Sequence, residues 1–297
     1  MIVITGANGF IGSNLAKSLQ DEKLVLVDDF SIHRFNFNDK TLIEREHFFE
    51  WMDFNGHDVK FIYHIGAITD TLITDVAYFQ KWNVDYTKQV WNCAVKYGIP
   101  LLYASSAATY GDGSMGYSDD HPMIVSLKPL NPYGDSKHIV DKWILEQEKT
   151  PPFWAGLKFF NVYGNGEYHK DHMASMIYKM YEQIRSYVPV RLFKYGEQQR
   201  DFVYVKDVIS ICKWFLDNQT HSGIYNIGTG NAVSFKEVAH TLYDVMSKWP
   251  DIEYVDMPSE IQARYQNYTQ ADVSKLRSIG YDKPFHTTRE GIEDFVS

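Results

Sequence analysis

The sequence Ile-Val-Ile-Thr-Gly-Ala-Asn-Gly-Phe-Ile-Gly occupies residues 2–12 and decides the fold of the chain. Its first part predicts a buried strand, and the apolar residues that follow, as far as Leu19, have helical spacing. The glycines between these elements let a pyrophosphate approach the backbone and the amino end of the helix. The stretch therefore predicts the opening of a dinucleotide-binding domain, although a plain tight turn can have the same spacing. The glycines are Gly6, Gly9 and Gly12.

The second apolar run, residues 24–27, predicts the next strand and ends in Asp28 and Asp29. An acidic residue at this place suits the 2′-hydroxyl of a ribose and repels a 2′-phosphate. Arg34 and Arg45 follow, however, and either side chain can reach a 2′-phosphate. The residues alone leave the choice between NAD and NADP open.

Two more apolar runs, residues 61–64 and 101–104, predict further strands of one parallel sheet. In such a sheet the functional groups lie just past the carboxyl ends of the strands. Gly66 and Ala67 follow the first run and allow a close approach to the backbone, whereas Ser106 follows the second. Ser106 can hydrogen-bond a reacting hydroxyl, but a serine after a strand is more often a helix cap.

Tyr133 and Lys137 lie four residues apart at the start of a helical segment, so that their side chains share one face. A phenol titrates near pH ~10, and bringing its pKa to about 7 needs roughly 4 kcal/mol. An ammonium ~4 Å away supplies roughly that much at an effective dielectric constant of about 20. The pair therefore predicts a proton shuttle. The alternative is a core tyrosine beside a solvated lysine.

The composition is that of a globular enzyme-sized chain, with 297 residues, 44% hydrophobic and 23% charged. The net charge of -9 argues against a nucleic-acid surface. Cys93 and Cys212 lie far apart, which signals neither a disulfide framework nor a zinc site. His169 and His172 are three apart but lack an evident third ligand, so we expect no metal. Without a basic leader or a long apolar run, we expect a cytoplasmic protein with no membrane association.

The features above resemble, in type and order, the extended short-chain dehydrogenase/reductase family of nucleotide-sugar enzymes. The resemblance implies a nicotinamide cofactor and hydride transfer, with Tyr133 as acid/base and Ser106 as its partner. Lys137 would position the ribose and tune the phenol. The features that carry the resemblance are the turn at 6–12, Asp28, Ser106, Tyr133, Lys137 and Asn161.

The chain is accordingly expected to be an α/β protein with a Rossmann-type doubly wound parallel sheet and a smaller interleaved α/β substrate domain. The rhythm of alternating strands and helices breaks after the run at 156–160 and returns at about 208. We therefore predict a dinucleotide-binding domain and a substrate-binding domain. The first comprises residues 1–162 and 201–229, and the second residues 163–200 and 230–297.

Within the family, five stretches most resemble the 6-epimerases of ADP-heptose: 103–111, 158–164, 169–175, 200–204 and 264–272. This implies conversion of ADP-D-glycero- to ADP-L-glycero-D-manno-heptose, a cytoplasmic step of lipopolysaccharide precursor synthesis. It also implies a tightly held NADP, with NAD possible, and a homo-oligomer, pentameric in the family.

The resemblance assigns residues to three functional sets. The catalytic set is Tyr133, Lys137, Ser106 and, as second acid/base, Lys170. The cofactor-binding set is Gly6, Gly9, Phe10, Ile11, Gly12, Asp28, Asp29, Arg34, Arg45, Gly66, Ala67, Asn83, Lys137 and Val162. The substrate-binding set is Ser106, Asn161, His172, Lys179, Phe193, Arg200 and Tyr265.

The implied reaction needs two proton donors. The hydrogen inverted at C6 is not next to a carbonyl, so it must leave as hydride rather than as a proton. The resulting 6-keto sugar turns and receives the hydride on its other face, where a second group must handle the proton. Tyr133 and Lys170 are predicted for these two orientations, and the residues do not say which serves which epimer. A solvated loop lysine is the alternative for Lys170.

Three other kinds of function share parts of this pattern. A dehydratase of this family carries Asp-Glu after the serine, where this chain has Ala107 and Ala108. A reductase, or an epimerase of a related GDP- or ADP-heptose, keeps the same motifs and stays open. A non-catalytic NAD(P)-binding regulatory protein usually loses the tyrosine or the lysine, and both are present.

Overall fold

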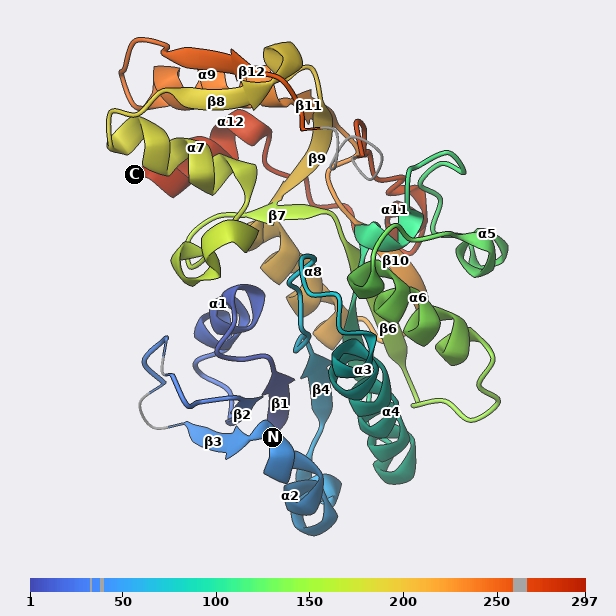
Figure 1. The fold of residues 1–297 in the computed structure, drawn as a ribbon. Helices are drawn as coiled ribbons and strands as arrows, with labels where there is room; N and C mark the ends of the chain where they lie inside the picture. Colours follow the sequence, from blue (N-terminus) through green and yellow to red (C-terminus); the bar gives the residue numbers. More distant parts are fainter. Residues whose placement is uncertain (33, 38–39, 259–265) are drawn as a thin grey trace.

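The computed structural model describes the chain except residues 33, 38–39 and 259–265, so the predicted substrate residue Tyr265 lies outside the described residues. The described chain forms a larger lobe around a seven-stranded sheet and a smaller lobe with two short sheets (Figure 1). All strand pairs of the large sheet are parallel. The strands, in spatial order, are β10 (Gly223–Ile227), β6 (Trp154–Phe159), β5 (Leu101–Ser106), β4 (Phe61–His64), β1 (Ile2–Thr5), β2 (Leu24–Asp28) and β3 (Thr41–Glu44).

The strand order reverses direction between β1 and β4, which pair in register with Thr5 opposite His64. In an open parallel sheet, this reversal opens a crevice beyond the carboxyl ends of the two strands, and ligands bind there. The doubly wound fold class predicted from the sequence is therefore confirmed. The predicted turn at residues 6–12 and the loop after β4 both lie at this crevice.

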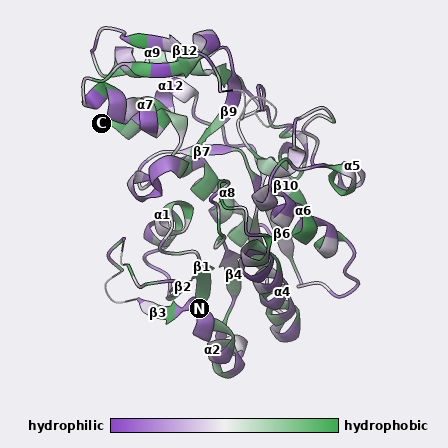
Figure 2. Cartoon of the chain, in the orientation of Figure 1, coloured by the Kyte–Doolittle hydropathy of each residue, from purple (hydrophilic) through white to green (hydrophobic). Residues whose placement is uncertain are grey.

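Both faces of the large sheet are buried, because its strands are nearly continuous runs of apolar residues. Ile2 and Ile4 join one apolar core, while Val3 between them joins another on the opposite face. Figure 2 shows hydrophobic colour along α8, which packs with α1 on the first face. The helices on the first face are α1 (Phe10–Ser18) and α8 (Val205–Asp217), and those on the second are α2 (Phe48–Asn55), α4 (Tyr86–Tyr97) and α6 (Pro132–Leu145).

The smaller lobe packs three helices around a three-stranded and a two-stranded sheet. Its strands are β11 (Ala232–Ser234), β9 (Gln199–Tyr204) and β7 (Asn161–Tyr163) in one sheet, with β12 (Ile252–Val255) and β8 (Val190–Phe193) in the other. Its helices are α7 (Met176–Arg185), α9 (Phe235–Val245) and α12 (Thr288–Val296). The remaining short helices are α3 (Val76–Phe79), α5 (His121–Ser126) and α11 (Ser274–Ser278).

The chain crosses between the lobes more than once. β6 and β10 belong to the large sheet, whereas β7 and β9, which follow and precede them, pair with each other in the smaller lobe. The predicted domain boundaries at 162/163, 200/201 and 229/230 stay a prediction. Within the described residues, no helix has the length and apolar character that a membrane crossing requires.

Candidate active site

The glycine turn between β1 and α1 leaves no room for side chains. Gly6 has a φ of +72°, and a Cβ on it would lie 2.5 Å from the Cα of Gly66 in the loop after β4. A Cβ on Gly12 would collide with the carbonyl oxygen of Gly6. Within the described part of the chain, no side chain accepts a hydrogen bond from the first N–H groups of α1. This bare backbone cradle at the crevice fits the pyrophosphate of a dinucleotide.

Asn8 lies inside the glycine turn and connects it to the end of β2. Its backbone N–H donates to Asp28 Oδ2 (2.8 Å), and its side-chain amide donates to the carbonyls of Asp29 (3.2 Å) and Ile32 (2.7 Å). Its Oδ1 accepts the backbone N–H of Arg34 (3.0 Å). The fully buried Asn8 therefore shapes the ribose end of the site. Sequence reasoning missed it, although a polar residue among three glycines was a usable signal.

The acidic and basic candidates for cofactor choice lie together at this end of the crevice. Burial raises the pKa of Asp28, although N–H groups of Asp29 and Asn8 oppose the shift. Arg45 lies 3.5 Å from the Asp29 carboxylate and stacks 3.9 Å above the ring of Trp82. A cation is thus held beside the acidic end of β2.

Asn83 lies in a π-helical turn, Gln80–Asp85, which precedes α4. Its Oδ1 accepts the N–H of Ile68 (2.8 Å), and its amide donates to the Ile68 carbonyl (2.9 Å) and to Ser136 Oγ (2.9 Å). Asn83 is fully buried, and both amide hydrogens are used within the protein. The predicted cofactor residue therefore ties the loop that carries Gly66 to α6.

Tyr133 and Lys137 lie one turn apart on α6, and Asn131 caps the amino end of that helix. A hydrogen bond joins the Tyr133 phenol to Ser106, the last residue of β5. Lys137 is 3% exposed and donates from Nζ to the Ala104 carbonyl (2.8 Å). The structure therefore brings the predicted serine, tyrosine and lysine to one edge of the sheet.

Ser106 has the capping role that the sequence offered, whereas its hydrogen bond to a reacting hydroxyl stays a prediction. Its hydroxyl accepts the N–H of Ala108 (3.1 Å), which caps the short helical turn after β5, and it also hydrogen-bonds Tyr133. The cap fixes the position of the hydroxyl that meets the phenol.

The expected tuning of Tyr133 by Lys137 is wrong in its direction. Burial raises the pKa of Tyr133, and the hydrogen bond from Ser106 opposes the shift only in part. Burial likewise lowers the pKa of Lys137 to about 8, with Asp141 opposing it. Desolvation disfavours the charged form of each group, and the sequence estimate left that effect out.

The segment 164–175, called the strap below, connects β7 to α7 and contacts the larger lobe. Glu167 orders it from inside: the buried carboxylate accepts N–H groups of Gly164 (3.1 Å) and Ser175 (2.7 Å). Its contacts with the larger lobe include a hydrogen bond from Asn14 to the Asn165 carbonyl (2.9 Å), one from Tyr168 to the Arg34 carbonyl (2.8 Å), and the pair of His172 with Asp70 (3.0 Å). The strap therefore lies beside the helix that follows the glycine turn.

Lys170 lies on the strap with its Nζ 5.4 Å from the ring centroid of Phe10. Phe10 is the first residue of α1, so the lysine stands at the dinucleotide cradle. Burial lowers the pKa of Lys170, whereas Glu167 raises it and Lys179 lowers it further. An amine with a lowered pKa at this place can exchange a proton with a ligand in the crevice.

The predicted substrate residues are only partly assembled. Lys179 donates to the His172 carbonyl (2.7 Å), so both lie at the end of the strap. Asn161 pairs with Phe202 in the three-stranded sheet, and Arg200, which is 8% exposed, lies on β9 of the same sheet. Phe193 ends β8 in the separate two-stranded sheet.

Asp201, next to Arg200, was missed by sequence reasoning. Its carboxylate is fully buried and accepts N–H groups of Thr229 (2.8 Å), Gly230 (2.9 Å) and Ala271 (3.0 Å). It therefore fixes the loop after β10 and the segment before α11 around Arg200. The Gly-Thr-Gly sequence at 228–230 was a visible signal of such a turn, but its partner was not visible.

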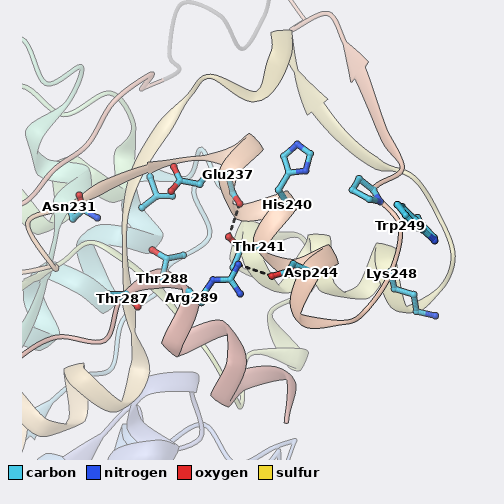
Figure 3. Close-up of a pocket in the computed structure, with 12 residues that line it drawn as sticks. Asn231, Glu237, His240, Thr241, Asp244, Lys248, Trp249, Thr287, Thr288 and Arg289 are labelled. Carbon is cyan, nitrogen blue, oxygen red and sulfur yellow. Dashed lines mark hydrogen bonds and ion pairs between the residues drawn. The ribbon is translucent and has the colours of Figure 1, made fainter.

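A cavity of about 720 Å³ on the smaller lobe is not the predicted site. Figure 3 shows its lining on α9 and at the start of α12, where Arg289 pairs with Asp244 (2.8 Å). Of the predicted cofactor and substrate residues that the structure describes, none lines it. Among the residues that the structure describes, no group of three His, Cys, Asp or Glu is arranged to hold a metal ion.

The glycine cradle, the acidic end of β2 and the Ser-Tyr-Lys arrangement at one edge of a parallel sheet define an NAD(P)-binding protein of the extended short-chain dehydrogenase/reductase class. The chain belongs to the NAD dependent epimerase/dehydratase family, whose model matches residues 2–228. This membership confirms the resemblance seen in the sequence.

Two curated relatives are similar to the whole chain. The ADP-L-glycero-D-manno-heptose-6-epimerase of Fusobacterium nucleatum is 40% identical over 323 residues, covering 100% of this chain and 97% of the relative. The enzyme of the same name from Nitratidesulfovibrio vulgaris is 37% identical over 313 residues, again covering 100% and 97%.

Solved structures show the same likeness. The ADP-L-glycero-D-manno-heptose-6-epimerase of Helicobacter pylori superposes with a TM-score of 0.85 at 27% identity, covering 99% of this chain and 94% of that one. The UDP-glucose 4-epimerase of Thermus thermophilus, solved with NAD, has a TM-score of 0.82 at 21% identity, covering 99% and 97%, and shows the fold alone.

Proposed function

We propose that this protein inverts C6 of an ADP-heptose, converting ADP-D-glycero- to ADP-L-glycero-D-manno-heptose with a bound nicotinamide dinucleotide. One observation carries the proposal: the phenol of Tyr133 on α6 and the amine of Lys170 on the strap, two groups able to exchange protons, come from opposite sides of one crevice. The names of the relatives from Fusobacterium nucleatum and Nitratidesulfovibrio vulgaris support the same substrate.

The residues divide the chemistry between them. When bound, the nicotinamide supplies a reversible acceptor for the C6 hydride. In one orientation Tyr133 exchanges the proton of the 6-hydroxyl, taking it as the phenolate and giving it as the phenol, and Ser106 holds the hydroxyl and the phenol in line through its hydrogen bond. Lys137, one turn after Tyr133 on α6, holds its Nζ against the Ala104 carbonyl. After the 6-keto sugar turns, Lys170 gives a proton to the oxygen in the second orientation.

We propose NADP as the cofactor. Arg34 and Arg45 support it, because Arg45 is held beside Asp29 at the ribose end and Arg34 follows in the same loop. The measurement is mass spectrometry of the cofactor released from denatured protein. NADP is expected, and NAD alone would overturn this part while leaving the epimerase proposal intact.

The reaction is tested with ADP-D-glycero-D-manno-heptose in heavy water and no added cofactor, followed by NMR. A mixture of the two C6 epimers with the original hydrogen at C6 is expected, because the hydride is returned internally. Turnover that requires added NADPH favours the alternative of a reductase. Deuterium at C6 rules out hydride return.

We also propose that the protein is a cytoplasmic homo-oligomer. Large apolar side chains are exposed on the smaller lobe, where Trp249 is 94% and Tyr187 81% exposed. Such exposure is typical of surfaces that bind another protein. Sedimentation velocity is expected to show a species larger than one chain, and a 34.5 kDa particle would overturn the proposal.

A further inference from the structure

A buried acid on α6 has no part in the chemistry above. Asp141 lies one turn after Lys137 and is fully buried, as is the side chain of Lys158 on β6. Its Oδ1 accepts the Tyr103 hydroxyl (2.9 Å), and its Oδ2 accepts the Ser105 hydroxyl (2.7 Å) and Lys158 Nζ (2.6 Å). A buried ion pair is weak evidence for stability, because desolvation offsets the attraction. Its position therefore calls for another explanation.

The hydrogen bonds lead from Asp141 to Ser106 by two routes. The first passes through the backbone of β5, because the Ser105 that donates to Asp141 is the residue before Ser106. The second passes through Lys158, which also donates to Thr109 Oγ1 (2.7 Å), and Thr109 donates to the Ser106 carbonyl (2.8 Å). The Asp141 carboxylate therefore fixes both Ser105 and Ser106.

The same carboxylate faces Lys137. Burial lowers the pKa of Lys137, and Asp141 is the group that raises it. The other titratable neighbour, His64 on β4, is hydrogen-bonded at both ring nitrogens, and burial lowers its pKa to about 3, so it carries no charge at neutral pH. The positive charge of Lys158 is compensated by its ion pair with Asp141.

We propose that Asp141 is the positioning residue of the Tyr133 site, on the premise that the protein has the function proposed above. It fixes Ser106 through Ser105 and through Lys158 and Thr109, and it keeps Lys137 charged against the Ala104 carbonyl. It touches neither substrate nor cofactor, so it acts through these residues.

The first experiment is the pH profile of epimerisation by Asp141→Asn. Without the negative charge, Lys137 loses its proton more readily, so the alkaline limb of kcat should move down by about 1 pH unit or more. At the optimum, kcat should fall by about 10- to 100-fold with a smaller change in KM, because the serine is displaced. Asp141→Glu should restore part of both effects.

Lys137 is also titrated directly by NMR of protein carrying ¹³C-labelled lysine, with Lys137→Met used to assign its signal. Its titration should move to lower pH in Asp141→Asn. This readout needs no substrate. A shifted titration with no turnover by any form, wild type included, counts against the proposed function alone. If Asp141→Asn is active but neither the Lys137 titration nor the alkaline limb of kcat moves, the inference is overturned and the proposed function stands.

Two further variants separate position from charge and from stability. Thr109→Val removes the hydrogen bond to Ser106 and keeps every charge, so kcat should fall about 10-fold with the alkaline limb unmoved. Asp207→Asn is the matched control, because Asp207 is also a buried acid in an ion pair, with His286 (2.7 Å). It should lower stability and leave the pH profile unchanged. If Asp141→Asn does not fold, full activity in Thr109→Val overturns the inference.

Discussion

The two sides of the crevice hold the proposed proton-transfer groups, Tyr133 and Lys170, in contrasting surroundings. On the side of β5 and α6, Tyr133 and Lys137 each have a hydrogen-bond partner, and Lys137 is 3% exposed. On the strap side, Lys170 is half-buried against the ring of Phe10, and the pair that ties the strap to Asp70 is partly exposed. The side of β5 and α6 is called pre-organised below, because Lys137 is more deeply buried than Lys170 and is held by a hydrogen bond.

The largest effect is expected on the pre-organised side. Tyr133→Phe removes the phenolic proton carrier and should lower kcat by about 10³-fold or more, starting from either epimer. The rate is measured by NMR of the two C6 epimers. Tyr97→Phe is the control, because its hydroxyl donates to Asp53 at the surface (3.3 Å), and it should keep full activity. Full activity in Tyr133→Phe would show that the two sides of the crevice do not differ in this way. It would favour the alternative of a non-catalytic NAD(P)-binding protein.

Lys170→Met tests whether the strap contributes chemistry. We expect kcat to fall by about 10²-fold, because one orientation loses its proton donor while the sugar still binds. Lys17→Met is a matched control, since Lys17 also lies 5.4 Å from a phenyl ring, that of Phe35. If the two variants behave alike, the strap only covers the crevice and a single acid/base must serve both faces.

Local patterns were sufficient to predict the strand, turn and helix at residues 2–19 and the pairing of Tyr133 with Lys137. Glycine spacing and helical spacing each depend on residues a few positions apart, so they can be read directly from the sequence. The parallel arrangement of the strands then followed from the alternation of strands and helices, which places functional groups at one edge of the sheet.

The parts that the sequence did not reveal depend on distant contacts. Asp141 accepts hydrogen bonds from residue 103, and Asp201 from residue 271, and nothing near either acid signals these partners. Asn83 was predicted to contact the cofactor, and only the fold shows that it ties a loop to Ser136. The direction of the Tyr133 pKa shift failed for the same reason, because burial is a property of the folded chain.

The pH dependence of stability should also distinguish the two sides. The pKa of Lys137 is about 8 in the folded chain and near 10.5 when unfolded, so between these values the unfolded chain binds the extra proton. Stability should therefore rise with pH, by about 2 kcal/mol between pH 8 and 9.5. Urea unfolding at both pH values measures it, and the rise should be smaller in Lys137→Met. An equal rise in that variant contradicts the assignment. Lys170→Met should change it less, because Lys170 is only half-buried.

The smallest effect is expected where the strap meets the larger lobe. His172→Gln removes the pair with Asp70, whose side chains are 54% and 30% exposed. Exposed ion pairs contribute about 0–1 kcal/mol, so the bound cofactor should dissociate from the variant at most about 5-fold faster than from the wild type. The rate is measured by trapping the dissociated cofactor. His47→Gln, which breaks a surface pair with Glu50, should not change it. A much larger acceleration in His172→Gln would mean that one contact holds the strap closed, and the strap would then be as firmly built as the side that carries Tyr133.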